Sequence, residues 1–165
     1  MRIGQRLGYW IIEWAGNFDP TLWDFLPHFP ELVMGNRIAI TSFDSGPFTP
    51  TQTDCAKGWC TQEGVAISPV IDNVEHLPAV GFDEWYVFSG HLSHIPLRSF
   101  VNRWGFAPLN DEDEGFEAFW EQVERCQPLH VIGAGTPSMF LVTKDRMIFE
   151  RISAASPALI DLSRP

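Results

Sequence analysis

The sequence predicts an α+β fold, a mostly antiparallel sheet with an amphipathic helix pair inserted between its strands. Short apolar and β-branched runs gather toward both ends of the chain, and two segments with helical spacing lie between them. Strands and helices do not alternate regularly, as they would in an α/β protein with a parallel sheet. The 165 residues contain no repeat and no linker, so we expect a single globular domain over residues 1–165.

The first third of the chain predicts a strand, a short helix and a hairpin. Residues 8–14 (GYWIIEW) form an aromatic and β-branched run that is typical of a strand. The Asp-Pro pair at 19–20 is typical of a helix start, because the carboxylate caps free amides and the proline φ suits the first turn. Gly35 predicts a tight turn that joins strands over residues 32–34 and 37–43.

The middle of the chain predicts a long loop and two strands. Residues 44–64 are rich in Gly, Pro, Thr and Asp without periodicity, which indicates a long surface loop. Residues 65–71 have strand character, but Pro69 lacks an amide donor and therefore predicts a place at a sheet edge. Residues 82–89 are apolar on both alternating faces, which predicts a central strand covered on each side.

Two amphipathic helices follow in the sequence. Residues 97–104 carry apolar side chains at i, i+3, i+4 and i+7 just after Pro96, which suits a first helical turn. Residues 111–125 repeat this spacing, and Asn110 or Asp113 can cap the second helix. These two helices are the expected pair between the strands.

The C-terminal part predicts three further strands and a tail. The strands cover residues 129–132, 138–143 and 146–151, and the last two form a hairpin. We expect residues 153–165 to be a loosely packed tail.

Charge is the property that most restricts the function. The formal net charge of −10 disfavours nucleic acids and anionic membranes as partners, because both require a positive protein surface. The second predicted helix holds most of this charge on Asp111, Glu112, Asp113, Glu114, Glu117, Glu121 and Glu124. The last three follow i, i+4, i+7 spacing and form one outward stripe. The stripe is either a solvated helix face or a surface that docks a basic protein.

Trp59 lies in the predicted long loop, between Cys55 and Cys60. An exposed tryptophan near Phe48 would be a binding anchor for a partner or a ligand. We expect three free thiols in a reduced, cytoplasmic protein, while the spacing of the two loop cysteines also allows a small disulfide or part of a zinc site. No window reaches the roughly eighteen apolar residues of a membrane span.

Two histidines, His91 and His94, lie between the predicted central strand and the first helix. A helical turn would place both rings on one side, and Asp83 or Glu84 could complete a zinc site with them. An HxxH pair lacks the HExxH arrangement, and the spacing fixes no third ligand. Either these are exposed histidines without a cofactor, or they belong to a zinc-dependent site.

The sequence favours a small acidic protein-binding domain without catalytic activity. Such a domain would neutralise or regulate a basic protein, as an immunity protein or an inhibitor does. One alternative is a metal-dependent hydrolase that uses His91 and His94. Another is a small-ligand or sugar-binding domain that uses exposed aromatic side chains.

Overall fold

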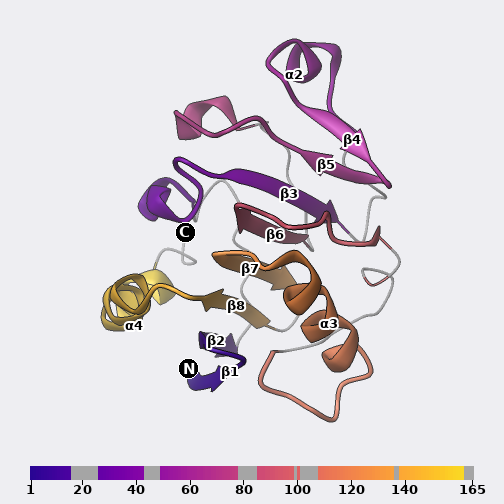
Figure 1. The fold of residues 1–165 in the computed structure, drawn as a ribbon. Coiled ribbons are helices and arrows are strands. Elements are labelled where there is room, and N and C mark those ends of the chain that lie inside the picture. Colours follow the sequence, from indigo (N-terminus) through magenta and orange to yellow (C-terminus); the bar gives the residue numbers. More distant parts are fainter. Residues whose placement is uncertain are drawn as a thin grey trace.

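The residues that the structure describes form one eight-stranded antiparallel sheet with helices on both faces (Figure 1). The computed structural model describes residues 1–15, 26–42, 49–77, 85–98, 100, 108–135 and 138–161. The strands are β1 (Arg2–Arg6), β2 (Tyr9–Ala15), β3 (Arg37–Ser42), β4 (Cys60–Gln62), β5 (Val65–Ile67), β6 (Trp85–Gly90), β7 (His130–Gly135) and β8 (Ser138–Thr143). The α-helices are α2 (Gln52–Ala56), α3 (Phe116–Cys126) and α4 (Arg146–Asp161), and the 3-10 helices are η1 (Leu26–His28), η2 (Pro30–Leu32) and η3 (Val74–His76). The predicted α+β class and the mostly antiparallel sheet are therefore confirmed.

The strand order places the N-terminal hairpin beside β8. The order is β1-β2-β8-β7-β6-β3-β5-β4, so the first hairpin pairs directly with the last strand. β6 lies inside the sheet between β7 and β3, and all six of its residues are buried. This confirms the predicted central strand. The sheet ends at β1 on one side and at the short β4 on the other (Figure 1).

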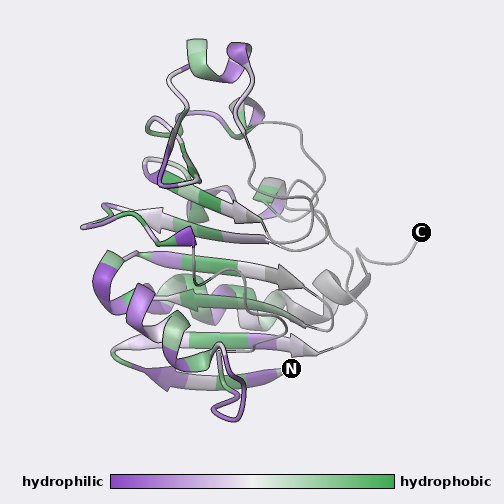
Figure 2. Cartoon of the chain, turned by 90° about the vertical axis from the view of Figure 1, so that its right-hand side faces the viewer, coloured by the Kyte–Doolittle hydropathy of each residue, from purple (hydrophilic) through white to green (hydrophobic). Residues whose placement is uncertain are grey.

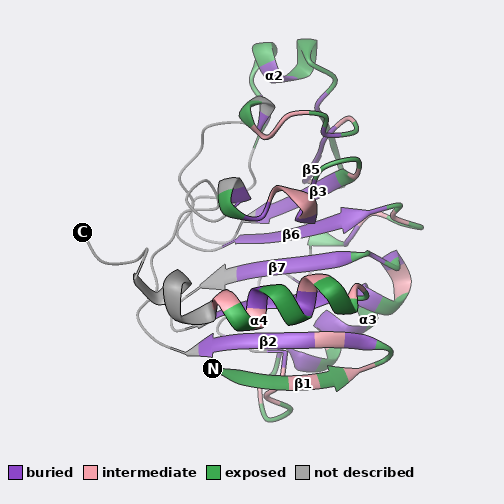
Figure 3. Ribbon diagram, turned by 90° about the vertical axis from the view of Figure 1, so that its left-hand side faces the viewer, coloured by how far each residue is buried: buried purple, intermediate pink, exposed green. Residues whose placement is uncertain are grey.

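The sheet separates two apolar clusters. In β2, Ile12 and Trp14 belong to the cluster under α4, whereas Tyr9 and Ile11 belong to the cluster under α3. Successive side chains of a strand point to opposite faces, so a strand covered on both sides carries apolar residues on both faces, and the buried Glu13 is the exception in β2. α4 lies in front of buried strands in Figure 3, while β1 is largely exposed at the edge.

α3 forms because its apolar residues repeat at helical spacing. Phe119 and Trp120 are almost fully buried, and their rings meet edge-on at a centroid distance of 5.2 Å. Each such burial contributes about 2–3 kcal/mol. Gln127 ends the helix in the left-handed region at φ 49°, and its amide donates to the Val123 carbonyl.

α3 begins later than the sequence predicts. Its N-cap is Gly115, which has no side-chain cap, so neither Asn110 nor Asp113 caps the helix. The segment 111–114 forms turns before the helix. The spacing of the apolar residues marks a helix well, but it does not mark the first residue with helical backbone angles.

The strand predicted over residues 146–151 is wrong, because these residues begin α4. Asp145 caps this helix, and its Oδ1 accepts from the amides of Met147 at 2.8 Å and Ile148 at 3.1 Å. Phe149 and Ile152 then pack in the cluster shared with β2 and β8. The expected tail from residue 153 continues this helix as far as Asp161.

The predicted hairpin around Gly35 is also wrong. Gly35 does adopt a positive φ of 74°, but the turn joins η2 to β3. β3 pairs with β5 and β6 instead of with residues 32–34. A local turn signal does not show which distant strand becomes the partner.

Two further strand predictions need correction. β5 lies between β3 and β4 and ends at Ile67, so Pro69 follows the strand and does not place it at an edge. β1 was not expected, because its polar sequence lacks a strand pattern. It forms by pairing with β2 through a two-residue turn in which Leu7 and Gly8 have φ of 52° and 79°.

Some predictions lie wholly or partly outside the described residues. The short helix that starts at 19–20 is one, and most of the helix predicted over 97–104 is another. Within the described part, the loop predicted over 44–64 contains both α2 and β4. Across that part of the chain, no helix combines the length and the apolar character needed to cross a membrane.

Candidate functional site

The described residues hold one concentrated acidic surface. We call it the α3 acidic surface, and it comprises Asp111, Glu112, Asp113, Glu114, Glu117, Glu121 and Glu124. All of these side chains are exposed except Asp113, which is half-buried. Figure 2 views the face of the molecule that carries α3, where both hydrophilic and hydrophobic residues occur along this helix. The outward stripe at i, i+4, i+7 lies where the sequence predicts it.

Arg6 is a basic residue that lies against this surface. Arg6 approaches Glu117 at 3.6 Å, and its guanidinium also lies 4.6 Å from the centre of the Phe116 ring. The Glu117 side chain remains 76% exposed, so the pair is screened by water and stabilises the fold weakly. Within the described part of the chain, Glu121 and Glu124 make no ion pair.

Arg125, the basic residue of α3, is directed away from the acidic surface. Its guanidinium donates to the Ile95 carbonyl and approaches Gln122 Oε1 at 3.4 Å. Gln122 is buried, and its Oε1 also accepts from the Leu97 amide at 2.8 Å. These bonds fix the segment before Leu97 against α3, and they leave the positive charge half-buried.

The two predicted metal ligands, His91 and His94, lie exposed in an irregular segment after β6. Gly90 opens this segment with a φ of 133°, and the Ser93 amide donates to the Cys126 carbonyl at 2.8 Å. The possible third ligands at 83–84 lie outside the described residues. Among the residues that are described, no three His, Cys, Asp or Glu side chains are grouped as a metal site would require.

Trp59 is not the exposed anchor that the sequence predicts. It is only 3% exposed and belongs to the apolar cluster under α4. The flanking Cys55 and Cys60 are both exposed and free. Part of the Trp59 side chain forms one wall of a pocket of about 310 Å³.

The turn from α2 to β4 forms one side of this pocket. Thr51 and Asp54 make a capping box, in which the Asp54 amide donates to Thr51 Oγ1 at 3.2 Å and the Thr51 amide donates to Asp54 Oδ2 at 2.9 Å. The Trp59 amide then donates to the Asp54 carbonyl at 3.1 Å, which closes the turn. Gly58 has a φ of 96°, a conformation that favours glycine.

The segment 69–72 forms the other side. It is held at both ends by the first residues of β3 and the turn before them. The Ser68 amide donates to the Ile38 carbonyl at 2.9 Å, and the Ile71 amide donates to the Asn36 carbonyl at 2.9 Å. The Gly35 amide donates to the Ile71 carbonyl at 2.8 Å. Both walls are therefore tied to the main sheet.

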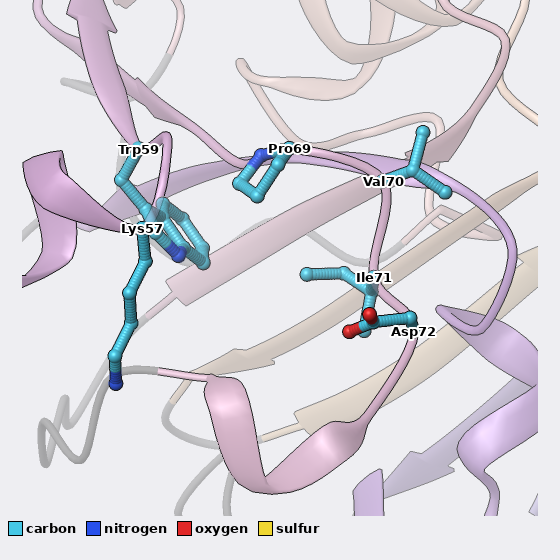
Figure 4. A pocket seen from close by; sticks show the side chains of 6 residues that line it. All are labelled: Lys57, Trp59, Pro69, Val70, Ile71 and Asp72. Carbon is cyan, nitrogen blue, oxygen red and sulfur yellow. The ribbon is translucent and has the colours of Figure 1, made fainter.

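The pocket combines apolar walls with two opposite charges. Its residues are Lys57, Trp59, Pro69, Val70, Ile71 and Asp72. Figure 4 shows Lys57 and Asp72 on opposite sides, with the Ile71 side chain and the Asp72 carboxylate pointing toward Trp59. Val70 is 56% exposed, and its side chain points away from Trp59 in Figure 4.

Three buried titratable groups serve the fold. Burial lowers the pKa of His130 from 6.5 to about 4, against an opposing effect of the Asp145 charge. Burial raises the pKa of the Cys126 thiol to about 11, although Arg125 acts in the other direction. Burial likewise raises the pKa of Tyr9, whose hydroxyl donates to the Pro128 carbonyl at 2.9 Å. A buried neutral thiol is a poor nucleophile, so these groups do not indicate a catalytic centre.

The acidic surface follows from spacing within one helix, whereas the pocket does not follow from any local pattern. The sequence singles out Trp59, but it contains no signal that Lys57 or Asp72 lines a pocket. The two walls of the pocket come together only because β3, β4 and β5 pair with one another. No protein-family model matches the chain, and no curated protein or solved structure is significantly similar to it.

Proposed function

We propose that this protein binds a basic protein in the cytoplasm through the α3 acidic surface, and that it neutralises or regulates this partner without a catalytic step of its own. The observation that carries the proposal is the division of α3 into two faces. Phe119 and Trp120 fix one face in the core, while Glu117, Glu121 and Glu124 stand exposed on the other.

The burial of the apolar face favours binding by holding the acidic face in place. Because Trp120 is 1% exposed and its indole Nε1 donates to the Pro108 carbonyl at 3.3 Å, α3 is tied both to the sheet and to the preceding segment. Its backbone is therefore ordered before a partner arrives. A preordered surface loses less conformational entropy on association than a flexible acidic tail would.

The spacing of the carboxylates favours electrostatic attraction. Side chains at i, i+4 on a helix lie about 5–6 Å apart at Cβ, which is less than the screening length of about 8 Å at physiological ionic strength. The fields of Glu117, Glu121 and Glu124 therefore reinforce one another outside the protein. Such a field accelerates the approach of a basic partner and opposes an acidic one.

Charge reversal on α3 tests the proposal. The test variant replaces Glu117, Glu121 and Glu124 by lysine. We expect it to lose salt-sensitive capture of a basic protein from the source cell, and to associate more slowly with the purified partner at low salt. The association rate, measured by stopped-flow mixing at several salt concentrations, should also lose most of its salt dependence.

A matched control separates position from total charge. Glu63, Glu75 and Glu150 are exposed residues outside α3, and their replacement by lysine changes the net charge equally, from −10 by three times +2 to −4. We expect this control to keep most of the association rate. Equal losses in both variants would mean that only net charge matters, and unchanged binding in the α3 variant would refute the proposed surface.

A further inference from the structure

The pocket beside Trp59 is separate from the α3 acidic surface. Trp59 and Ile71 belong to the cluster under α4, on the face of the sheet opposite to α3. The pocket volume of about 310 Å³ lies at the small end of the range of ligand pockets, about 300–1,000 Å³. Its size therefore suits a small molecule and not a folded partner.

The apolar part of the pocket is rigid inside and open at its mouth. Trp59 and Ile71 are almost fully buried, so they form fixed inner walls. Pro69 is half-buried beside Trp59 in Figure 4, and contact with an apolar ligand would remove its ring from water. The small exposed part of the Trp59 ring offers no open face on which a sugar could stack, which disfavours the sugar-binding alternative.

The two charged side chains of the pocket determine which charged groups a ligand must carry. Lys57 and Asp72 lie on opposite sides in Figure 4. The lysine ammonium has three donors that suit a carboxylate, and the aspartate has about four acceptor positions, enough to accept from a ligand ammonium besides its contacts within the chain. A ligand with one charge would meet the group of like sign on the other side.

We propose that this pocket binds a small zwitterion with an apolar body, which is the chemistry of a free amino acid or a dipeptide. The ligand carboxylate pairs with Lys57 and its ammonium pairs with Asp72. The apolar side chain lies against Pro69 at the mouth of the pocket. This site is independent of the proposed docking of a basic protein, and either can fail without the other.

Calorimetric titration of the full chain tests the site with defined probes. The zwitterions are L-leucine and L-leucyl-L-leucine. The one that binds more tightly shows whether the pocket prefers a free amino acid or a dipeptide. The single-charge analogues are N-acetyl-L-leucine, which lacks the ammonium, and L-leucinamide, which lacks the carboxylate. We expect saturable binding of a zwitterion and at least about ten-fold weaker binding of each analogue, because each loses one charge-assisted hydrogen bond.

Two variants connect each charge to its half of the ligand. Lys57→Met should weaken the zwitterion about ten-fold, whereas L-leucinamide should bind no more weakly than before, since it has no carboxylate to lose a partner and no longer meets a like charge. Asp72→Asn should weaken the zwitterion, whereas N-acetyl-L-leucine should bind no more weakly than before, since it has no ammonium and no longer meets a like charge. Both side chains are exposed, so the variants should fold normally by circular dichroism. Glu75→Gln removes the same charge as Asp72→Asn at an exposed position that does not line the pocket, and it should have no effect.

Several results would overturn the proposal. One is that neither zwitterion shows saturable binding at ligand concentrations up to the millimolar range. Another is that the single-charge analogues bind as tightly as the zwitterion, which would show that the pocket does not recognise both ligand charges at once. A third is an equal effect of Asp72→Asn and Glu75→Gln, which would assign the change to overall charge.

Discussion

Acidification from pH 7 to pH 5 should destabilise the protein through His130. The ring of His130 is fully buried, and its Nδ1 lies 2.8 Å from Thr143 Oγ1. That hydroxyl also accepts from the Asp145 amide at 2.9 Å. Among the described residues, Nε2 has no hydrogen-bond partner. A second proton would place a positive charge in this buried site, away from water.

The magnitude follows from the lowered pKa. Desolvation lowers the pKa of His130 from 6.5 to about 4, despite the opposing charge of Asp145. Between these two values the unfolded chain binds more protons at this site than the folded protein, so stability falls as the pH falls. The stabilisation is complete above pH 6.5 and is lost progressively toward pH 4. The total is about 3 kcal/mol, of which about 2 kcal/mol disappears between pH 7 and pH 5.

Urea unfolding of the wild type and a His130→Leu variant measures this contribution. Other groups also titrate in this range, but their effects cancel in the difference between the two proteins. We expect the stability of the wild type relative to the variant to decrease by about 2 kcal/mol from pH 7 to pH 5. A difference that stays constant over this range would refute the reasoning. An independent readout is the ring Hε1 resonance of His130, which should shift with a midpoint near pH 4.

Two further predictions concern α3. Trp120→Ala should lower the free energy of unfolding in urea by about 3–5 kcal/mol, because the indole is almost completely buried. Glu121→Ala on the exposed face should change it by less than about 0.5 kcal/mol. Similar effects of the two substitutions would contradict the division of the helix into two faces. Cys126 should resist Ellman's reagent at pH 8 in the native protein, since burial raises the pKa of its thiol to about 11. The two exposed cysteines, Cys55 and Cys60, should react. Rapid modification of all three thiols would contradict the burial of Cys126.

The sequence predicts best those elements whose own residues carry the whole pattern. The central strand could be recognised because both of its faces are apolar, and the acidic stripe because Glu117 to Glu124 share one helical spacing. The start of α4 resembles a strand in the sequence because 147–149 are three consecutive apolar residues. Its helical period becomes visible only when Ile152 is included, and its start depends on the cap from Asp145.

The elements that could not be predicted depend on distant partners. β1 has the sequence RIGQR, which contains one large apolar residue, and it becomes a strand because β2 offers it a free edge. The polar, loop-forming neighbours of Trp59 predict an exposed side chain. Its burial depends on packing against residues such as Ile71, whose position is set by the bond from its amide to Asn36. The residues around Trp59 do not indicate that Ile71 bonds to Asn36, so its burial cannot be predicted from them.

The place of β2 beside β8 also determines when the sheet can be completed. Trp10 lies opposite Thr143, so the strand that is synthesised second must wait for the strand that is synthesised last. A two-stranded hairpin is marginally stable alone, and during this delay Ile11 and Ile12 lack the strand that shields them. Pairing across such a distance in the chain slows folding. The nascent protein therefore exposes an aggregation-prone hairpin until β8 emerges, and a chaperone that shields this hairpin would raise the yield of folded protein.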